Sequence, residues 1–178
     1  ADFDYFRLVF EAYRALRRAG LSVDILPVGN AVPEGYRLVL VPGCAALPGG
    51  WAERLADSGA TVILGPRTGA KTPEMATPLP LPPALPGLDV TVARVESLPP
   101  SEARPVPGGG HVLHWAETLE GAAPVRFALA DGAPVLMGEG ALRYLGGWPD
   151  AMLWDRILAD CGLATEPLPD GLRLRDLG

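Results

Sequence analysis

The chain has 178 residues, of which 48% are hydrophobic and 20% are charged, and its formal net charge is −6. This length and composition predict one globular domain and argue against general disorder. The negative charge, without a dense lysine and arginine cluster, argues against nucleic-acid binding, and no apolar run is long enough for a membrane helix. We expect a cytoplasmic protein with neither a nucleic-acid nor a membrane partner.

Residue usage gives two hints about origin. The chain opens at Ala1, which favours a segment cut from a longer or processed protein. Lys71 is the only lysine, Asn30 is the only asparagine and glutamine is absent, a composition typical of thermophiles and also of GC-rich genomes. Cys44 and Cys161 lie far apart, and we expect both to be reduced core thiols.

The first third of the chain alternates between helical and extended patterns. In chain order, the pattern predicts a helix over 3–19, strands over 23–26 and 38–41, a helix over 51–57 and a strand over 61–64. In the first helix, the stripe expected to face the core consists of Phe6, Val9, Tyr13 and Leu16. This order of elements is the opening of a doubly wound parallel sheet.

The remainder of the chain is richer in turns. Six prolines between Thr72 and Pro86 exclude a helix or an inner strand there, and 99–110 is expected to be a second flexible stretch. Further strands are predicted over 89–96, 111–117, 125–129, 134–137 and 141–145, followed by a closing helix over 150–161. The late strands are expected to be antiparallel, which gives a three-layer α/β fold of Rossmann-like or flavodoxin-like type, mostly parallel elsewhere.

The most enzyme-like feature is the turn Gly65-Pro66-Arg67-Thr68-Gly69, which follows the third predicted strand. The order of elements resembles class I glutamine amidotransferases, which place a cysteine nucleophile at the middle of such a turn. Arg67 occupies that position here, and a guanidinium cannot act as a nucleophile. The turn is therefore interpreted as a tight structural connection, or as the place where Arg67 or Lys71 makes an ionic contact with a partner domain.

An alternative enzyme hypothesis uses Cys44 as the nucleophile of an amidotransferase-like hydrolase. His111, His114 and Glu117 could supply a base and its orienting group, but the two histidines should point to opposite faces of a strand. No nucleotide-binding glycine motif or ligand-spaced Cys/His cluster is present, so we expect no cofactor and no metal. The four tryptophans, which include Trp115 and Trp148, fit core or interface positions better than sugar stacking.

Taken together, several segments resemble the trimerisation domain of glycoside hydrolase family 42 β-galactosidases. The segments are Phe3-Asp4-Tyr5, Tyr13 to Arg17, Val23-Asp24-Ile25, Gly35 to Pro42, Gly65 to Thr72, Arg94 to Leu98 and Tyr144 to Trp148. The resemblance covers nearly the whole chain in the right order. It implies a homotrimeric parent enzyme with the catalytic glutamates in a (β/α)₈ barrel domain that this chain lacks.

The resemblance assigns no catalytic residue to this chain. In the family the acid/base glutamate follows an asparagine, whereas Asn30 precedes Ala31. The resemblance implies a noncatalytic trimerisation domain over 1–171 and a link or the start of a C-terminal domain over 172–178. Its partners would be other copies and the parent's barrel domain, and the candidate contact residues are Arg67, Lys71, Trp115 and Trp148.

Overall fold

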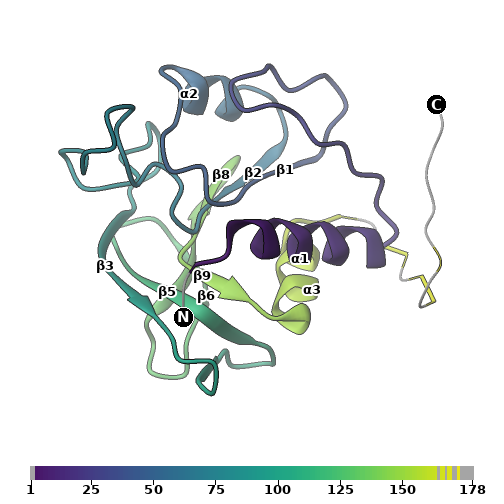
Figure 1. Cartoon of the computed structure of the whole chain (residues 1–178). Coiled ribbons are helices and arrows are strands. Elements are labelled where there is room, and N and C mark those ends of the chain that lie inside the picture. The colour runs from purple at the N-terminus through teal and green to yellow at the C-terminus, as the bar shows by residue number, and fades with distance from the viewer. Residues whose placement is uncertain (1–2, 164, 167, 170–171, 173–178) are drawn as a thin grey trace.

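The computed structural model describes residues 3–163, 165–166, 168–169 and 172. The predicted link over 172–178 therefore lies, apart from Leu172, outside the described residues. The elements are α1 (Tyr5–Arg18), β1 (Leu38–Val41), α2 (Trp51–Ala56), β2 (Thr61–Leu64), β3 (Thr91–Ser97), β4 (Ala103–Pro105), β5 (His111–Glu120), β6 (Val125–Ala128), β7 (Pro134–Glu139), β8 (Leu142–Leu145), β9 (Gly147–Pro149) and α3 (Ala151–Asp160) (Figure 1). No helix among these is long and apolar enough to cross a membrane.

The strands form two sheets. The larger sheet has the order β1-β2-β8-β7-β6, in which β1, β2 and β8 are parallel and β7 and β6 are antiparallel. The smaller sheet has the order β3-β5-β4, with β9 also paired to β5, and all its pairings are antiparallel. The expectation of a mostly parallel sheet was wrong, because β6, β7 and β8 follow one another through short connections, which join antiparallel neighbours.

Helices and loops cover both faces of the larger sheet. Leu38, Leu40 and Ile63 belong to a core cluster that also contains residues of α1 and α3. The intervening Val39 and Val62 belong to a second cluster, with α2 and the proline-rich segment. Because successive side chains of a strand point to opposite faces, these strands are almost entirely apolar. The parallel strands therefore pack against a core cluster on each face of the sheet.

The first helix forms as predicted but buries a different face. The Asp4 carboxylate caps its N-terminus by accepting a hydrogen bond from the Arg7 backbone N–H at 3.0 Å. The buried side chains of the helix are Leu8, Ala12, Ala15 and Arg17. Phe6 is 83% exposed and Phe10 and Tyr13 are also exposed, so the predicted inward stripe was wrong. The small alanines allow α1 to lie close against the core, which the larger aromatic rings would prevent.

Two further expectations fail at the backbone level. Residues 23–26 form no strand, and Ile25 and Leu26 are exposed, because this segment pairs with no neighbouring strand. The stretch 99–110 was expected to be flexible, but it contains β4, which pairs with β5 from Ala103 to Pro105. The helices and the remaining strands occupy the predicted ranges to within a few residues, and the short β9 was not predicted. β8 is antiparallel to β7, as expected, and is also parallel to β2.

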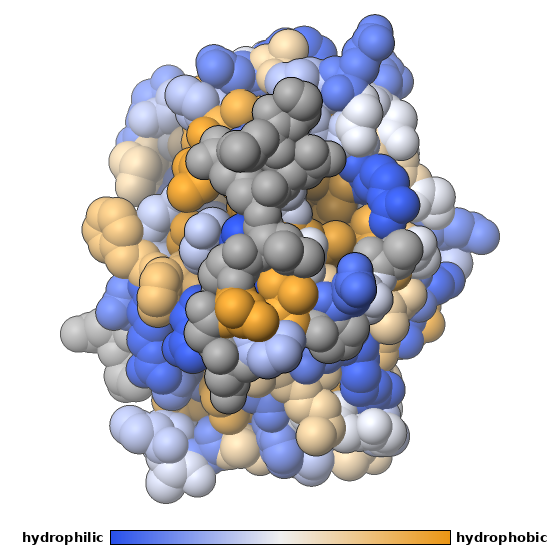
Figure 2. Space-filling model, turned by 90° about the vertical axis from the view of Figure 1, so that its right-hand side faces the viewer, coloured by the Kyte–Doolittle hydropathy of each residue, from blue (hydrophilic) through white to orange (hydrophobic). Residues whose placement is uncertain are grey.

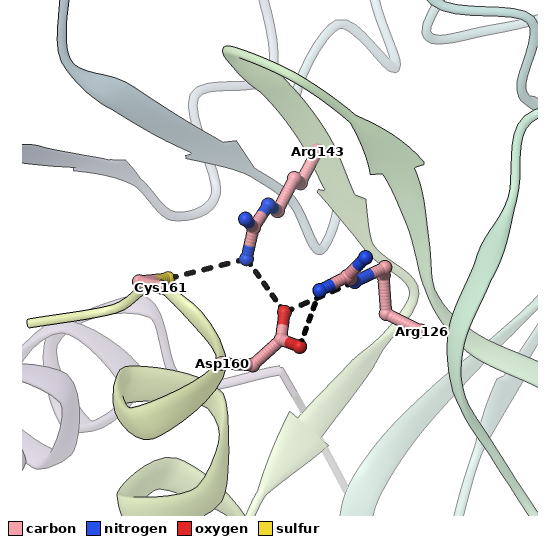
Figure 3. Close-up of polar contacts among 4 residues, drawn as sticks. All are labelled: Arg126, Arg143, Asp160 and Cys161. Atoms are coloured by element: carbon pink, nitrogen blue, oxygen red, sulfur yellow. Dashed lines mark hydrogen bonds and ion pairs between the residues drawn. The ribbon is translucent and has the colours of Figure 1, made fainter.

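An arginine pair fastens the end of α3 to the larger sheet (Figure 3). The Asp160 carboxylate accepts hydrogen bonds from Arg126 Nη2 and Arg143 Nη1, each at 2.6 Å, and from Arg126 Nε at 3.1 Å. Arg143 Nη1 also lies 3.4 Å from the Cys161 sulfur. Since Arg143 is 8% exposed, Asp160 supplies the negative charge that compensates a nearly buried cation.

Replacing Asp160 with alanine should therefore lower the free energy of unfolding by about 2 kcal/mol, because it removes charge-assisted hydrogen bonds from a buried arginine. Urea unfolding followed by circular dichroism measures this change. The matched control is Asp155→Ala, which removes a more exposed partner of Arg18. Equal losses in the two variants would show that burial of Arg143 contributes nothing to the effect.

Candidate functional site

The turn after β2 is held in a fixed shape by the core. The Thr68 hydroxyl, which is fully buried, donates to the Val41 backbone oxygen at 2.6 Å and accepts from the Gly65 N–H at 3.0 Å. Gly65 has φ 92°, and a Cβ atom there would lie 2.4 Å from the Leu145 oxygen. Only glycine fits at this position. Arg67 also has a positive φ, of 63°, so the middle residue of the turn adopts a conformation that side chains rarely take.

A buried carboxylate stabilises this conformation. Glu117, on β5, is 6% exposed. Its Oε1 accepts hydrogen bonds from the Arg67 backbone N–H at 2.9 Å and from Trp115 Nε1 at 3.0 Å, and its Oε2 accepts from the Tyr144 hydroxyl at 2.9 Å. Burial raises the pKa of Glu117 above its ordinary value of 4.5, although all three donors act in the opposite direction. Glu117 therefore joins the smaller sheet to the turn and to β8.

This pKa shift predicts a pH dependence of stability. A carboxyl group whose pKa is higher in the folded state stabilises the fold at low pH and loses that contribution as pH rises through the folded pKa. We expect the wild-type chain to lose stability above about pH 4.5 relative to Glu117→Gln, which does not titrate. Urea midpoints of both proteins at several pH values between 4 and 8 test this expectation. Parallel midpoint curves would contradict it.

The Arg67 side chain lies against two aromatic rings that also contact each other. Its guanidinium carbon is 4.7 Å from the centroid of Phe3 and 5.2 Å from that of Trp115. Phe3 also contacts Trp115 and Trp148 edge to face, at centroid distances of 5.3 Å and 5.7 Å. Arg67, Phe3 and Trp115 are all half-buried, so the cluster reaches the surface. Cation–π contacts of this kind hold a guanidinium in place without neutralising it.

Trp148 supports the same cluster from inside the domain. It is 1% exposed, and its Nε1 donates to Glu11 Oε2 at 2.6 Å, which ties β9 to α1. His114 packs edge to face against it, and burial is the main cause of a lowered pKa for this histidine, followed by the nearby Arg7 charge. Three of the four predicted contact residues, Arg67, Trp115 and Trp148, therefore lie together. Trp148 leaves almost no side-chain surface for a direct contact with a neighbour.

The fourth predicted contact residue is in a different place. Lys71 lines an open groove of about 290 Å³, together with Glu53 and residues of the proline-rich segment. Its backbone N–H donates to the Ala45 oxygen at 2.9 Å, so the chain at this point is fixed to the loop after β1. Arg67, Trp115 and Trp148 do not line this groove.

The alternative nucleophile is not placed for catalysis. Cys44 Sγ lies 3.5 Å from the Ala46 oxygen, and burial raises the pKa of this thiol, which makes it less reactive. His111 Nδ1 pairs with Asp150 Oδ2 at 2.9 Å, and His114 contacts Trp148. Over the part of the chain that the structure describes, neither histidine forms a hydrogen bond with Cys44. The hypothesis of a hydrolase based on Cys44 therefore lacks its base.

Sequence reasoning missed several members of the cluster. Phe3 and Tyr144 were used only as members of predicted elements and of family motifs. Glu117 was considered only as an orienting group for catalysis, whereas it serves as a buried acceptor. Its place directly after the apolar pair Trp115-Ala116 was a signal in the sequence, since a carboxylate among buried positions requires donors nearby.

Fold and site together define an α/β domain whose turn after the second parallel strand presents a guanidinium instead of a nucleophile. The family model described as the β-galactosidase trimerisation domain matches residues 1–164. The chain belongs to this family.

Known β-galactosidases contain similar segments. The chain is 39% identical to β-galactosidase BgaA of Thermus sp, over all of this chain and 29% of that protein. It is 33% identical to β-galactosidase Bga of Halorubrum lacusprofundi, over 97% of this chain and 29% of that protein. The crystal structure of the β-galactosidase from the psychrophilic Marinomonas ef1 superposes with a TM-score of 0.90 at 36% identity, covering 99% of this chain and 28% of that one. The chain thus spans less than a third of these relatives, and the Thermus relative agrees with the thermophile hypothesis.

Proposed function

We propose that this chain is the noncatalytic domain that holds three copies of a β-galactosidase together, while a barrel domain elsewhere in the parent hydrolyses terminal β-D-galactosides. The family match and the relatives support this proposal. A domain boundary at residue 171 and a cytoplasmic location belong to the same proposal. Cys44 and Cys161 are both free thiols, which fits a reducing compartment.

The observation that carries the proposal is the outward face of α1. Phe6, Phe10 and Tyr13 lie at i, i+4 and i+7, so their side chains share one face of the helix, and all three are exposed. Other exposed large hydrophobic residues include Ile25, Val28 and Met152. Figure 2 shows hydrophobic residues lying among hydrophilic ones on one side of the molecule. Aromatic residues that remain exposed in this way are typical of surfaces that a partner covers.

We further propose Arg67, Lys71 and Trp115 as contact residues, with Trp148 as their support from inside. A glutamine amidotransferase-like origin of the fold is part of this proposal. The parallel strands β1, β2 and β8 and the positive φ of Arg67 support it. In such a scaffold the loops after parallel strands gather at one edge of the sheet, where binding sites commonly form.

Removing the aromatic face should weaken assembly. In the full-length protein, the double replacement Phe6→Ala and Phe10→Ala is expected to raise the dissociation constant of the trimer about tenfold or more, because aromatic residues commonly carry the binding energy of interfaces. Sedimentation velocity over a range of concentrations measures it. The control is Leu79→Ala, which removes a side chain that is 90% exposed on the proline-rich segment.

The mass of the unaltered protein is the first test. A trimer at micromolar concentration is expected, and a monomer at every concentration would refute the proposed function. If the double replacement Phe6→Ala and Phe10→Ala leaves the dissociation constant of the trimer unchanged, the interface lies away from the α1 face.

A further inference from the structure

The guanidinium of Arg67 has donors without acceptors. An arginine side chain carries five N–H donors. Among the described residues, the Arg67 side chain contacts the rings of Phe3 and Trp115 but forms no hydrogen bond or ion pair. Glu117 is the nearby acid, yet both of its oxygens already accept hydrogen bonds, from the Arg67 backbone, Trp115 and Tyr144. Apart from the electrostatic attraction of Glu117, the charge of Arg67 therefore has no hydrogen-bonded or ion-paired partner among the described residues.

The position of this charge is fixed in advance. The positive φ of Arg67 is maintained by the bond from its N–H to Glu117, and the next residue, Thr68, is bonded to β1. Backbone conformations of this kind cost energy and persist where the surrounding structure imposes them, often at binding sites. Two aromatic rings then restrict the side chain itself. A ligand would therefore meet a group that has already lost most of its conformational freedom.

We propose that Arg67 is the receptor for a carboxylate side chain, from aspartate or glutamate, of a second copy of this chain. A carboxylate matches the planar fork of a guanidinium and forms two parallel hydrogen bonds with it. The inference rests on the proposed function, because it names the chemistry of one contact in the trimer. It also explains why an arginine, rather than a lysine, occupies the turn.

Charge complementarity points to a second copy as the source. The chain carries 21 acidic and 15 basic side chains. Many arginines are already paired within the domain, as Arg104 is with Glu96 and Arg126 with Asp160. Exposed carboxylates without a hydrogen bond or ion pair in the described part of the chain include Glu34, Glu74 and Glu120. A neighbouring copy therefore offers the group that Arg67 lacks.

The first experiment compares the self-association of full-length variants by sedimentation velocity. Arg67→Gln removes the charge and should raise the dissociation constant of the trimer about thirtyfold, the usual effect of deleting one partner of a hydrogen-bonded charge pair at an interface. Arg67→Lys keeps the charge but loses the fork, so an intermediate value is expected. The control Arg37→Gln makes the same charge change at an exposed position in the loop before β1. Thermal unfolding of each variant checks that the domain still folds.

The second experiment identifies the source of the carboxylate. In an Arg67→Lys, Lys71→Arg background, a carbodiimide couples the introduced amine to a carboxylate that lies against it. The protein is first mixed from ¹⁴N-labelled and ¹⁵N-labelled copies, unfolded and refolded together, so that the trimers contain both. Mass spectrometry of the cross-linked peptide pairs that contain position 67 then shows whether the two joined peptides carry the same nitrogen isotope or different ones.

Peptide pairs of mixed isotope, together with a weaker Arg67→Gln trimer, are the expected result. Pairs of a single isotope would show that the carboxylate comes from the same polypeptide and would overturn the assignment to a second copy. A dissociation constant for Arg67→Gln equal to that of the wild type would overturn the carboxylate site while leaving the trimer intact. A monomeric wild type would refute the proposed function and this inference together.

Discussion

Replacing Glu117 with alanine is expected to lower the free energy of unfolding by about 3–5 kcal/mol. The substitution removes the acceptor of three donors, the Arg67 N–H, Trp115 Nε1 and the Tyr144 hydroxyl. Tyr144 is 1% exposed, so water cannot readily replace the lost acceptor. A buried donor without an acceptor costs about 1–3 kcal/mol, and three such losses are a large part of the stability of a domain this size.

The glutamine variant separates hydrogen bonding from charge. In Glu117→Gln, the amide oxygen can accept from Arg67 and Trp115, and the amide nitrogen can donate to the Tyr144 oxygen. We expect its stability at neutral pH to remain close to that of the wild type. Urea unfolding followed by tryptophan fluorescence measures both variants. If glutamine and alanine were equally destabilising, the contribution of Glu117 would be its charge rather than its hydrogen bonds.

The second large effect is expected at Trp148. Truncation to alanine removes one of the largest fully buried side chains of the domain and its hydrogen bond to Glu11. Such substitutions cost about 3–5 kcal/mol, from lost burial and from the cavity that remains. Because Trp148 joins β9 to α1 through Glu11, we also expect faster hydrogen exchange in the middle of α1.

Trp148→Phe is the matched variant for this prediction. It keeps an aromatic ring in contact with Phe3 and His114 but lacks the indole N–H that bonds to Glu11. Its expected cost is about 1–2 kcal/mol, much less than that of alanine. Thermal denaturation of the three proteins tests this order. A stability of Trp148→Ala similar to that of the wild type would mean that the packing described for Trp148 contributes nothing.

Loss of trimer in Trp148→Ala reports unfolding of the domain, so Arg67 and Trp115 are the better probes of the interface.

The sequence predicted the positions of the helices and strands better than it predicted which strands pair. Apolar runs such as Leu38 to Val41 and Thr61 to Leu64 identify strands because both of their faces are buried, and the structure confirms both. Val23 to Leu26 has a similar composition but pairs with no strand, and pairing depends on distant residues that local pattern does not contain. For the same reason, the antiparallel majority of the pairings was not predicted.

The error in α1 has a different physical cause. Its apolar residues surround most of the helix, so periodicity alone allowed either of two faces to be buried. We chose the face with the larger side chains, Phe6 and Tyr13, whereas the fold buries Ala12 and Ala15, which permit closer approach to the core. Under the proposed function, large aromatic residues on the surface reflect contacts with other copies. A search for the core of a single copy therefore places these residues inside by mistake.

The candidate site was predicted in part. The arginine-bearing turn was identified from the spacing of Gly65 and Gly69, and Trp115 and Trp148 lie beside it. The grouping itself was not predicted, because it depends on β5 and β9 being neighbours. Lys71 was chosen with Arg67 because the two are close in sequence, but it lines a different groove.

The larger sheet ends at β1, whose four residues, Leu38 to Val41, are all apolar. Within the described residues no strand lies on its outer side, so one row of peptide groups is left as a template onto which a foreign strand could add. When heat partly opens a domain, strands of other copies can add to such an unpaired sheet edge and form ordered aggregates. The outer edge of β1 is therefore a place where the partly opened domain is at risk of adding a foreign strand.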